Sequence, residues 1–210
     1  MSAPTSTRSR TRNPRGEGSR LREDIVDSAL ALIEETGSAD ALSLRAIARG
    51  AGVTAPSIYA HFADLDEIIW AVVTQAFEEL SAALRAATEG IADPVEQLHA
   101  GCHAYLAFAR EHPQCYAVLF GRHGAEVTSI SRDEFAGVSG AESFGILVDA
   151  VAKCAAAGRS DSTDAFADAT AVWAGLHGYA SLRANHLGFP WPEGDTLPDA
   201  MIDRLARITA

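Results

Sequence analysis

Residues 54–61 combine hydrogen-bonding side chains with small residues that let another molecule come close. The hydrogen-bonding residues are Thr54, Ser57, Tyr59 and His61, and the small ones are Ala55 and Pro56. Hydroxyl and imidazole groups can exchange hydrogen bonds with base edges and phosphate oxygens. To do so they must point outwards from one rigid support, which the neighbouring residues have to supply.

The support expected on the N-terminal side is a short helix followed by a tight turn. Leu44, Ile47 and Ala48 recur at the spacing of one helix face, and Ser43 can cap that helix. The run Gly50-Ala51-Gly52 ends it, because glycine neither prolongs a helix cheaply nor resists a turn. A second helix is predicted to begin directly after this turn.

The second short helix carries the hydrogen-bonding residues. Thr54 can cap it, and Pro56 falls in its first turn, where a missing backbone N–H costs little. Ile58 and Phe62 are four residues apart and are expected to face the core. Two helices joined in this way make a helix-turn-helix, whose second helix can enter the major groove of DNA. Short helical hairpins also occur in proteins that never contact DNA, so geometry alone leaves both interpretations open.

Arginines near this motif offer positive charge to a phosphate backbone. Arg45 stands in the first turn of the first helix, outside its apolar face, and can reach a phosphate or a base; a salt bridge to an acidic residue of the preceding helix is the alternative. Residues 1–18 are expected to form a disordered arm, which either contacts phosphates or a minor groove or is a solvated tail. Its charges are Arg8, Arg10, Arg12 and Arg15.

The segment from Leu21 to about Leu80 resembles the DNA-binding domain of the TetR family of bacterial transcriptional regulators. The resemblance is carried by EETG at 34–37, LSLRAIARGAGV at 42–53, APSIYAHF at 55–62 and the acidic start of a long helix after that. It implies an all-α protein, with a three-helix DNA-binding head followed by a larger helical domain for ligand binding and dimerisation. The implied DNA-binding residues are Arg45, Thr54, Ala55, Pro56, Ser57, Tyr59 and His61.

The chain departs from the family at Leu65, where a lysine that holds the DNA backbone usually stands. Losing one phosphate contact should flatten the salt dependence of binding by about one unit without abolishing binding. Leu65 can instead extend the apolar face of the long helix that follows, which repeats apolar residues from Ile68 to Leu84.

The composition supports a folded body that carries the negative charge. The chain has 210 residues, 48% of them hydrophobic, and a net charge of −11. Residues 1–64 hold eight arginines and eight acidic residues, so the body carries the full negative charge and would help to turn the neutral head towards DNA. Without a signal peptide or an apolar run of about 18 residues, we expect a cytoplasmic protein with no membrane contact. Cys102, Cys115 and Cys154 provide no disulfide framework.

The pattern predicts four parts: the arm (1–18), the DNA-binding head (19–64), a connecting helix (65–90) and the ligand-binding and dimerisation domain (91–210). The first helix of the head should run from about Arg20 to Thr36, with Ser19 as its cap. Body helices are expected at about 94–111, 114–120, 141–158, 162 or 163 to 185, and 199–208. Residues 121–140 are predicted to be a loop that gates a pocket or only connects two helices.

Large and small residues alternate in the last long helix, at 172–182. Gly175 and Gly178 each cost about 1 kcal/mol inside a helix, which suggests close packing against another helix. The sequence W-x-x-x-H-G at 173–178 resembles a motif of one TetR subgroup, and this implies a homodimer formed through the last two long helices of each subunit. Trp173 and His177 then line a ligand cavity or serve in packing alone. The pocket is expected to be mostly apolar, with polar groups from His99, His103, Tyr105, Tyr116, Trp173 or His177.

His99 and His103 are four residues apart on one helix and could share a metal ion, with Cys102, His112 or Cys115 nearby in sequence. No third ligand comes with a recognisable spacing, so the expectation is that the protein uses no metal and no cofactor.

These features together predict a DNA-binding transcriptional regulator that is not an enzyme. It is expected to be a repressor that leaves a near-palindromic operator when a small molecule binds. An enzyme would need a nucleophile or an acid–base pair with an orienting partner, and the sequence offers none. The remaining alternative is a helical small-molecule carrier or sensor with a weakened DNA-binding head, which Leu65 and the net charge favour.

Overall fold

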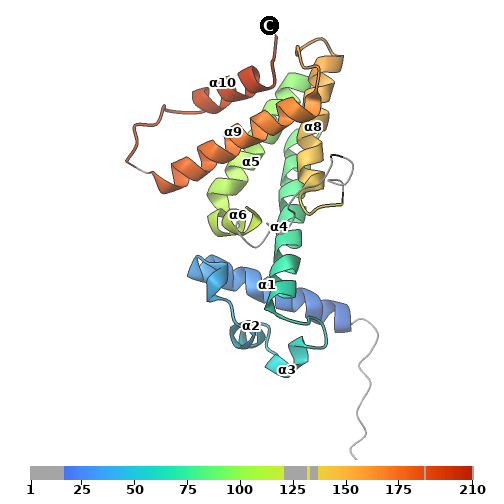
Figure 1. Cartoon of the computed structure of the whole chain (residues 1–210), viewed down its shortest axis with the longest axis vertical. Coiled ribbons are helices and arrows are strands. Elements are labelled where there is room, and N and C mark those ends of the chain that lie inside the picture. Colours follow the sequence, from blue (N-terminus) through green and yellow to red (C-terminus); the bar gives the residue numbers. More distant parts are fainter. Residues whose placement is uncertain (1–16, 121–131, 133–136, 187, 210) are drawn as a thin grey trace, which may run out of the picture.

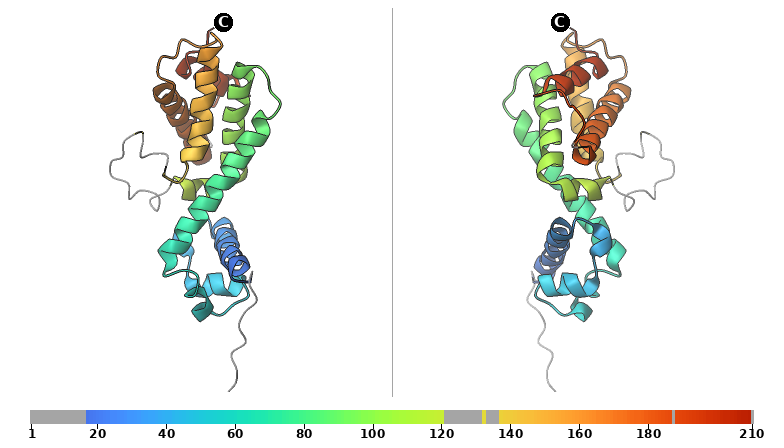
Figure 2. Two further views of the ribbon diagram at one scale, coloured as in Figure 1. Left: turned by 90° about the vertical axis from the view of Figure 1, so that its right-hand side faces the viewer. Right: turned by 90° about the vertical axis from the view of Figure 1, so that its left-hand side faces the viewer.

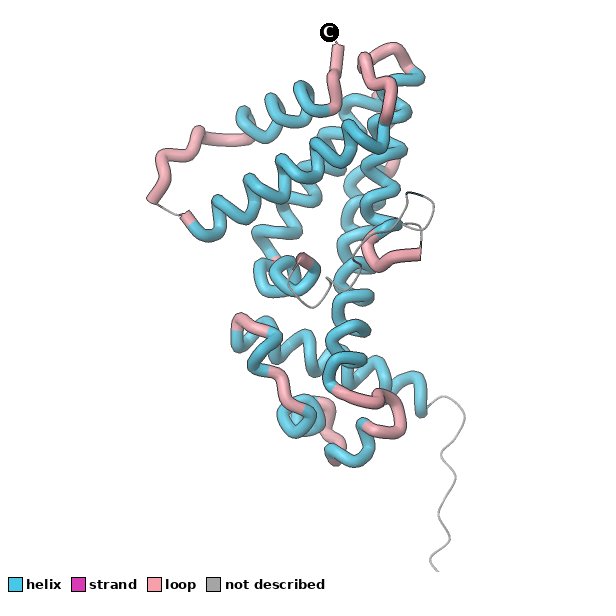
Figure 3. The backbone as a smooth tube through the Cα atoms, viewed as in Figure 1, coloured by secondary structure: helices cyan, strands magenta, loops and turns pink. Residues whose placement is uncertain are grey.

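The computed structural model describes residues 17–120, 132, 137–186 and 188–209. Within them the regular elements are helices, as predicted, beside one isolated bridge between Ser160 and Ile208 (Figure 3). None of the described helices is long and apolar enough to cross a membrane. The elements are α1 (Glu17–Thr36), η1 (Ala39–Ala41), α2 (Leu44–Gly50), α3 (Ala55–Ile58), α4 (Leu65–Thr88), α5 (Pro94–Glu111), α6 (Pro113–Leu119), α8 (Ala141–Ala156), α9 (Ala165–Asn185) and α10 (Thr196–Leu205).

Helices α1, α2 and α3 form a small group, and α5 to α10 form a larger one (Figure 1). The small group, here called the head, packs around a cluster that includes Ile25, Ile33 and Ile47. Ile58 and Phe62 are 0% and 1% exposed within this cluster, so their predicted direction towards the core is confirmed. The larger group is here called the body.

The predicted starts of three helices are wrong. Helix α1 begins at Glu17, so Ser19 lies inside its first turn, and a glutamate suits the positive end of a helix. Helix α10 begins at Thr196 and not at Asp199, because Pro198 is tolerated in the first turn of a helix. Helix α9 begins after Asp164, whose carboxylate accepts a hydrogen bond from the N–H of Ala167 at 3.1 Å. Ser162 does not cap it, because its buried hydroxyl makes no hydrogen bond to any described residue.

Helix α4 connects the head to the body. Its first turn is fixed by a reciprocal pair of hydrogen bonds, in which Asp64 accepts from the N–H of Glu67 and Glu67 accepts from the N–H of Ala63. Leu65 packs against the head cluster, which confirms that it extends the apolar face of this helix. Figure 2 shows α4 passing from one group to the other. Its buried residues in the head are Ile68, Ile69, Val72 and Val73, and those in the body are Ala76, Leu80 and Leu84.

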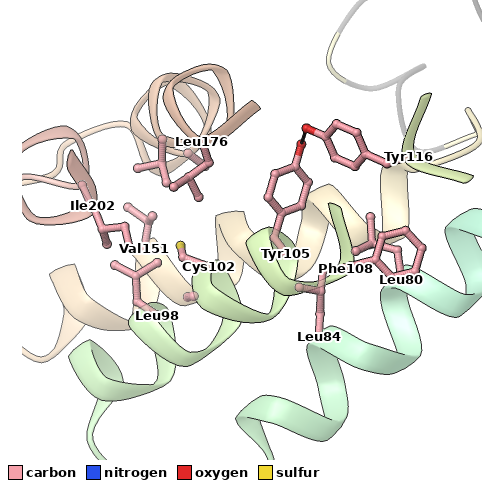
Figure 4. Packing of buried hydrophobic residues seen from close by; sticks show 14 of the residues in the cluster. Leu80, Leu84, Leu98, Cys102, Tyr105, Phe108, Tyr116, Val151, Leu176 and Ile202 are labelled. Atoms are coloured by element: carbon pink, nitrogen blue, oxygen red, sulfur yellow. Dashed lines mark hydrogen bonds between the residues drawn. The ribbon is translucent and has the colours of Figure 1, made fainter. Parts of the chain in front are cut away.

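The body packs α4, α5, α8, α9 and α10 around a second apolar cluster, part of which is drawn in Figure 4. The close helix packing predicted at the two glycines is confirmed at one of them. A Cβ atom on Gly175 would lie 2.9 Å from Leu205 and 3.0 Å from Met201, both in α10. A Cβ atom on Gly178 would meet no described atom within 4 Å. Helix α10 therefore lies directly against Gly175.

Residues 1–16 of the predicted arm and most of the predicted loop at 121–140 fall outside the described residues, whereas residues 17 and 18 of the predicted arm belong to α1. The expectations about phosphate contact by the arm and gating by the loop stay predictions.

Candidate DNA-binding surface and ligand cavity

The turn between α2 and α3 depends on a glycine. Ser43 caps α2 by accepting a hydrogen bond from the N–H of Ala46, as predicted. Gly52 then adopts a positive φ of 68°, a conformation that other residues reach only with strain. The N–H of Val53 donates to the carbonyl of Ala48 at 2.8 Å and closes the turn. Helix α3 is thus held at a fixed position after α2.

The polar residues of α3 and its ends lie at the surface. Tyr59 is 61% exposed, and the side chains of Thr54 and Pro56 are exposed as well. Ala55, Ser57 and His61 are partly exposed. Thr54 precedes α3 but does not cap it, because its hydroxyl is 2.8 Å from the hydroxyl of Ser57 and bonds there instead. Helix α3 lies at the end of the head that faces away from the body, so these residues are accessible to another molecule (Figure 1).

Arginines flank this surface. Arg45 and Arg49 are exposed on α2, and among the described residues no carboxylate pairs with Arg45. Arg22 of α1 stacks over the ring of Phe62 at 4.8 Å and brings a further positive charge beside α3. Nothing in the sequence around Arg22 indicates this position, because it depends on how α1 crosses the end of α3. These charges suit a polyanionic partner.

The body encloses a cavity of about 370 Å³ between α4, α5, α8 and α9. Among the described residues, the lining contains no charged side chain and no histidine. Its polar groups include Thr88, Gln97, Ser143 and Thr170, and its aromatic side chains are Phe77, Tyr105, Phe120, Phe144, Phe166 and Trp173. The site can therefore hold an apolar molecule with a few hydrogen-bonding groups.

Two of the predicted ligand-binding residues, Tyr105 and Trp173, line this cavity. Tyr116 and His177 lie just behind the lining. The hydroxyl of Tyr116 is 2.7 Å from that of Tyr105 and 2.6 Å from Nδ1 of His177 (Figure 4 shows the two tyrosines). The aromatic ring of Phe120, which lines the cavity, lies 4.7 Å from the ring of His177.

Burial keeps this hydrogen-bonded group uncharged. It raises the pKa of Tyr105 far above its ordinary value and that of Tyr116 to about 12. Burial also lowers the pKa of His177, so its imidazole is neutral at neutral pH. A neutral imidazole and two neutral phenols can each donate and accept, which lets the group rearrange when a ligand hydroxyl arrives at Tyr105.

The structure places the other two predicted ligand-binding residues, His99 and His103, away from the cavity. They lie on a different face of α5, which is turned towards α10. Nε2 of His103 is 2.7 Å from a carboxylate oxygen of Asp199, and the two ring nitrogens of His99 face Asp199 and Asp203. Partial burial tends to raise the pKa of Asp199, but the hydrogen bonds from His103 and His99 outweigh it and the pKa is lowered.

Comparison with known protein families identifies the chain. Residues 25–72 match the model of bacterial regulatory proteins of the tetR family. Residues 98–207, more than half of the chain, match the tetracyclin repressor-like C-terminal domain. The chain belongs to the TetR family. It is a DNA-binding transcriptional regulator.

Individual relatives and solved structures are similar to this chain. An uncharacterized HTH-type transcriptional regulator of Mycobacterium tuberculosis is 29% identical over 168 residues, which cover 77% of this chain and 69% of that protein. The structure of a protein with unknown function from Rhodococcus sp. RHA1 is 28% identical, with a TM-score of 0.71 over 93% of this chain and 95% of the other. RolR in complex with resorcinol is similar in fold, at 18% identity and a TM-score of 0.64 over 94% and 92% of the two chains.

Two elements of this TetR-family regulator connect the cavity with the head. Helix α4 contributes Leu80 and Leu84 to the cavity lining and continues into the head cluster. Helix α6 carries Tyr116 beside the cavity and Val118, which is 5% exposed, in the head cluster. The sequence predicted α6 as a buried helix but gave no sign that it is shared between the two clusters.

Proposed function

We propose that this regulator is a homodimeric repressor that leaves a near-palindromic operator when an uncharged, mostly apolar small molecule enters the cavity of the body. The single observation that carries the proposal is that α4 lines the cavity at one end and forms part of the head core at the other.

The exposed surface around α3 is the proposed contact with the operator. Thr54 and Ser57 supply hydrogen-bonding groups at the N-terminal end of α3, where a recognition helix meets base edges, and Tyr59 supplies one directly after its C-terminal end. Arg22, Arg45 and Arg49 supply charge for the phosphates. The full proposed DNA-binding set keeps Arg45, Thr54, Ala55, Pro56, Ser57, Tyr59 and His61 and adds Arg22 and Arg49.

The chemistry of the cavity supports a neutral ligand. An ion placed there would lose its hydration without meeting an opposite charge among the described lining residues, which costs several kcal/mol or more. Tyr105 offers a phenol hydroxyl and Gln97 an amide to a ligand with one or two polar groups. Tyr116 and His177 act behind them as a hydrogen-bonded support.

Release follows if the ligand binds one arrangement of α4 better than another. A ligand against Leu80 and Leu84 presses on the body half of α4, and the packed head half has to follow. Since interiors are close-packed, α3 moves with it. A second path runs through α6, from Tyr116 to Val118. Movement of both heads of a dimer changes the spacing of the two α3 helices, which must match successive major grooves about 34 Å apart.

The proposed dimer forms through α8 and α9, the last two long helices. The side chain of Leu182 in α9 is 49% exposed. Gly178 lies one turn before it, and a Cβ atom added to Gly178 would have no described atom within 4 Å, so the space beside it is open. A small residue and an exposed leucine on one helix face are suited to close packing against a second copy.

The test is a gel shift with the purified protein and the DNA that flanks its own gene, at two salt concentrations. A discrete complex with a short near-palindrome, released by members of a panel of neutral aromatic compounds, would support the proposal. Diffuse binding that salt removes would instead favour the helical carrier or sensor with a weakened head. A discrete complex that no compound releases would separate DNA binding from the proposed ligand response.

A further inference from the structure

We propose that His99, His103 and Asp199 form a binding site for one divalent transition metal ion, with Zn²⁺ as the preferred ion, and that this ion joins α10 to α5. The site is separate from the cavity and from the DNA-binding surface.

The ligand atoms converge from two helices. His99 and His103 are one turn apart on α5, a spacing that directs two imidazoles at one point. Asp199 of α10 faces both, with distances from its Oδ1 of 3.2 Å to Nδ1 of His99 and 2.7 Å to Nε2 of His103. The three ligand atoms all lie within 4.8 Å of one another. In a tetrahedral zinc site neighbouring ligand atoms are about 3.3 Å apart, so the distance between Asp199 and His103 would have to lengthen by about 0.6 Å to admit the ion.

The hydrogen bonds of His99 provide an independent argument. Both of its ring nitrogens face a carboxylate oxygen, Nδ1 that of Asp199 and Nε2 that of Asp203 at 2.9 Å. When Nδ1 binds the ion, Nε2–H is left to donate to Asp203, the arrangement that commonly orients a metal-binding histidine.

The charge of the site and its exposure to solvent are also suited to a divalent transition metal ion. Asp199 and Asp203 place two carboxylates beside the two imidazoles, and a divalent cation would balance their charge. The side chains of His99, His103 and Asp199 are 22%, 34% and 43% exposed, so an ion can reach them from solvent. Two nitrogen ligands and one carboxylate suit Zn²⁺ better than Mg²⁺ or Ca²⁺, which prefer oxygen. The fourth position is left for water.

The sequence does not indicate this site because one of its three ligands, Asp199, comes from a distant helix. His99 and His103 suggest a metal pair, but the expected partners nearby in sequence do not take part. Cys102 and Cys115 are 3% and 1% exposed in the body core. The third ligand lies 96 residues after His103, and only the packing of α10 on α5 brings it close.

The test uses the full chain without a histidine tag, treated with a chelator and then titrated with ZnCl2 by calorimetry. We expect one Zn²⁺ per chain and a higher melting temperature, since the ion binds the folded form. His103→Gln and Asp199→Asn should each weaken binding by at least about 100-fold, and Asp203→Asn by about 10- to 100-fold. His186→Gln, at an exposed histidine at the end of α9, is the matched control and should bind as the wild type does.

A measurement on the wild type needs no variant. In NMR spectra of the imidazole nitrogens, Zn²⁺ should move the signals of two of the seven histidines. Absence of saturable binding, binding that both ligand variants retain, or shifts at other histidines would overturn the proposal and leave a histidine–carboxylate hydrogen-bond cluster only. None of these readouts uses DNA, so the outcome is independent of the proposed repressor function.

Discussion

Replacing Tyr59 by alanine should weaken operator binding strongly while leaving the fold intact. The side chain is 61% exposed and lies outside the head cluster. Substitutions at such positions change the free energy of unfolding by about 0.5 kcal/mol or less. A side chain that reads a base contributes about 1–3 kcal/mol, and a two-fold dimer uses it twice. The expected loss is therefore about 2–6 kcal/mol, which is roughly 30-fold to 10⁴-fold in Kd.

Fluorescence anisotropy with a labelled operator, measured over a range of salt, separates this effect from a loss of charge. Because Tyr59 is neutral, Tyr59→Ala should lower the affinity at every salt concentration without changing the slope of log K against log [salt]. Arg45→Ala should instead reduce that slope by about one unit per subunit.

The matched control is Trp70→Ala, which removes another exposed aromatic side chain from α4, outside the helix-turn-helix. It should leave operator affinity within about threefold, because exposed substitutions outside an interface have small effects. Two results would refute the assignment of α3 as the helix that reads the operator. The Tyr59→Ala variant could bind the operator as tightly as the wild type does, or its loss of affinity could be explained by a lower melting temperature.

Three further predictions concern the body and its connection to the head. Burial lowers the pKa of His177 below 6.5, so the unfolded chain takes up a proton that the folded chain does not, and the wild type should lose melting temperature as the pH falls from about 6.5 to about 5. His177→Gln should lose less over that range, and equal losses would contradict the burial argument. Val118→Ala should lower the free energy of unfolding in urea by about 1.5–3 kcal/mol and reduce the effect of a ligand on operator binding; an unchanged ligand effect would exclude α6 as a connection. Leu182→Glu should convert the dimer to a monomer in light scattering with unchanged helix content, and a persistent dimer would place the interface elsewhere.

The head could be predicted from the sequence because its signals are local. Ser43 and Gly52 act through caps and turns formed with residues within a few positions. The apolar residues Ile58 and Phe62 are close enough in the chain for helical spacing to show their direction. Ser19 is an exception, because α1 begins at Glu17 and runs through Gly18 and Ser19, so a residue that suits a cap does not by itself mark the start of a helix.

The body could be predicted only in part because its site depends on how helices cross. Tyr105 and Trp173 line the cavity, yet their neighbours in the same patterns do not: His103 lies two residues before Tyr105 and faces α10 instead. Phe77 and Phe144 line it although nothing in the sequence separates them from ordinary core residues. Cavity shape depends on contacts between residues far apart in the chain, which periodicity does not report.

The most direct test of the proposed ligand response is the affinity of a releasing compound for the free protein and for the protein saturated with operator. Trp173 lines the cavity and can report binding by its fluorescence in a variant with Trp70→Phe and Trp191→Phe, which removes the other two tryptophans. If α4 couples the cavity to the head, the compound should bind the operator complex more weakly, by the same factor by which it lowers operator affinity, about 5- to 150-fold. Equal affinity for the free and the operator-bound protein would contradict the account.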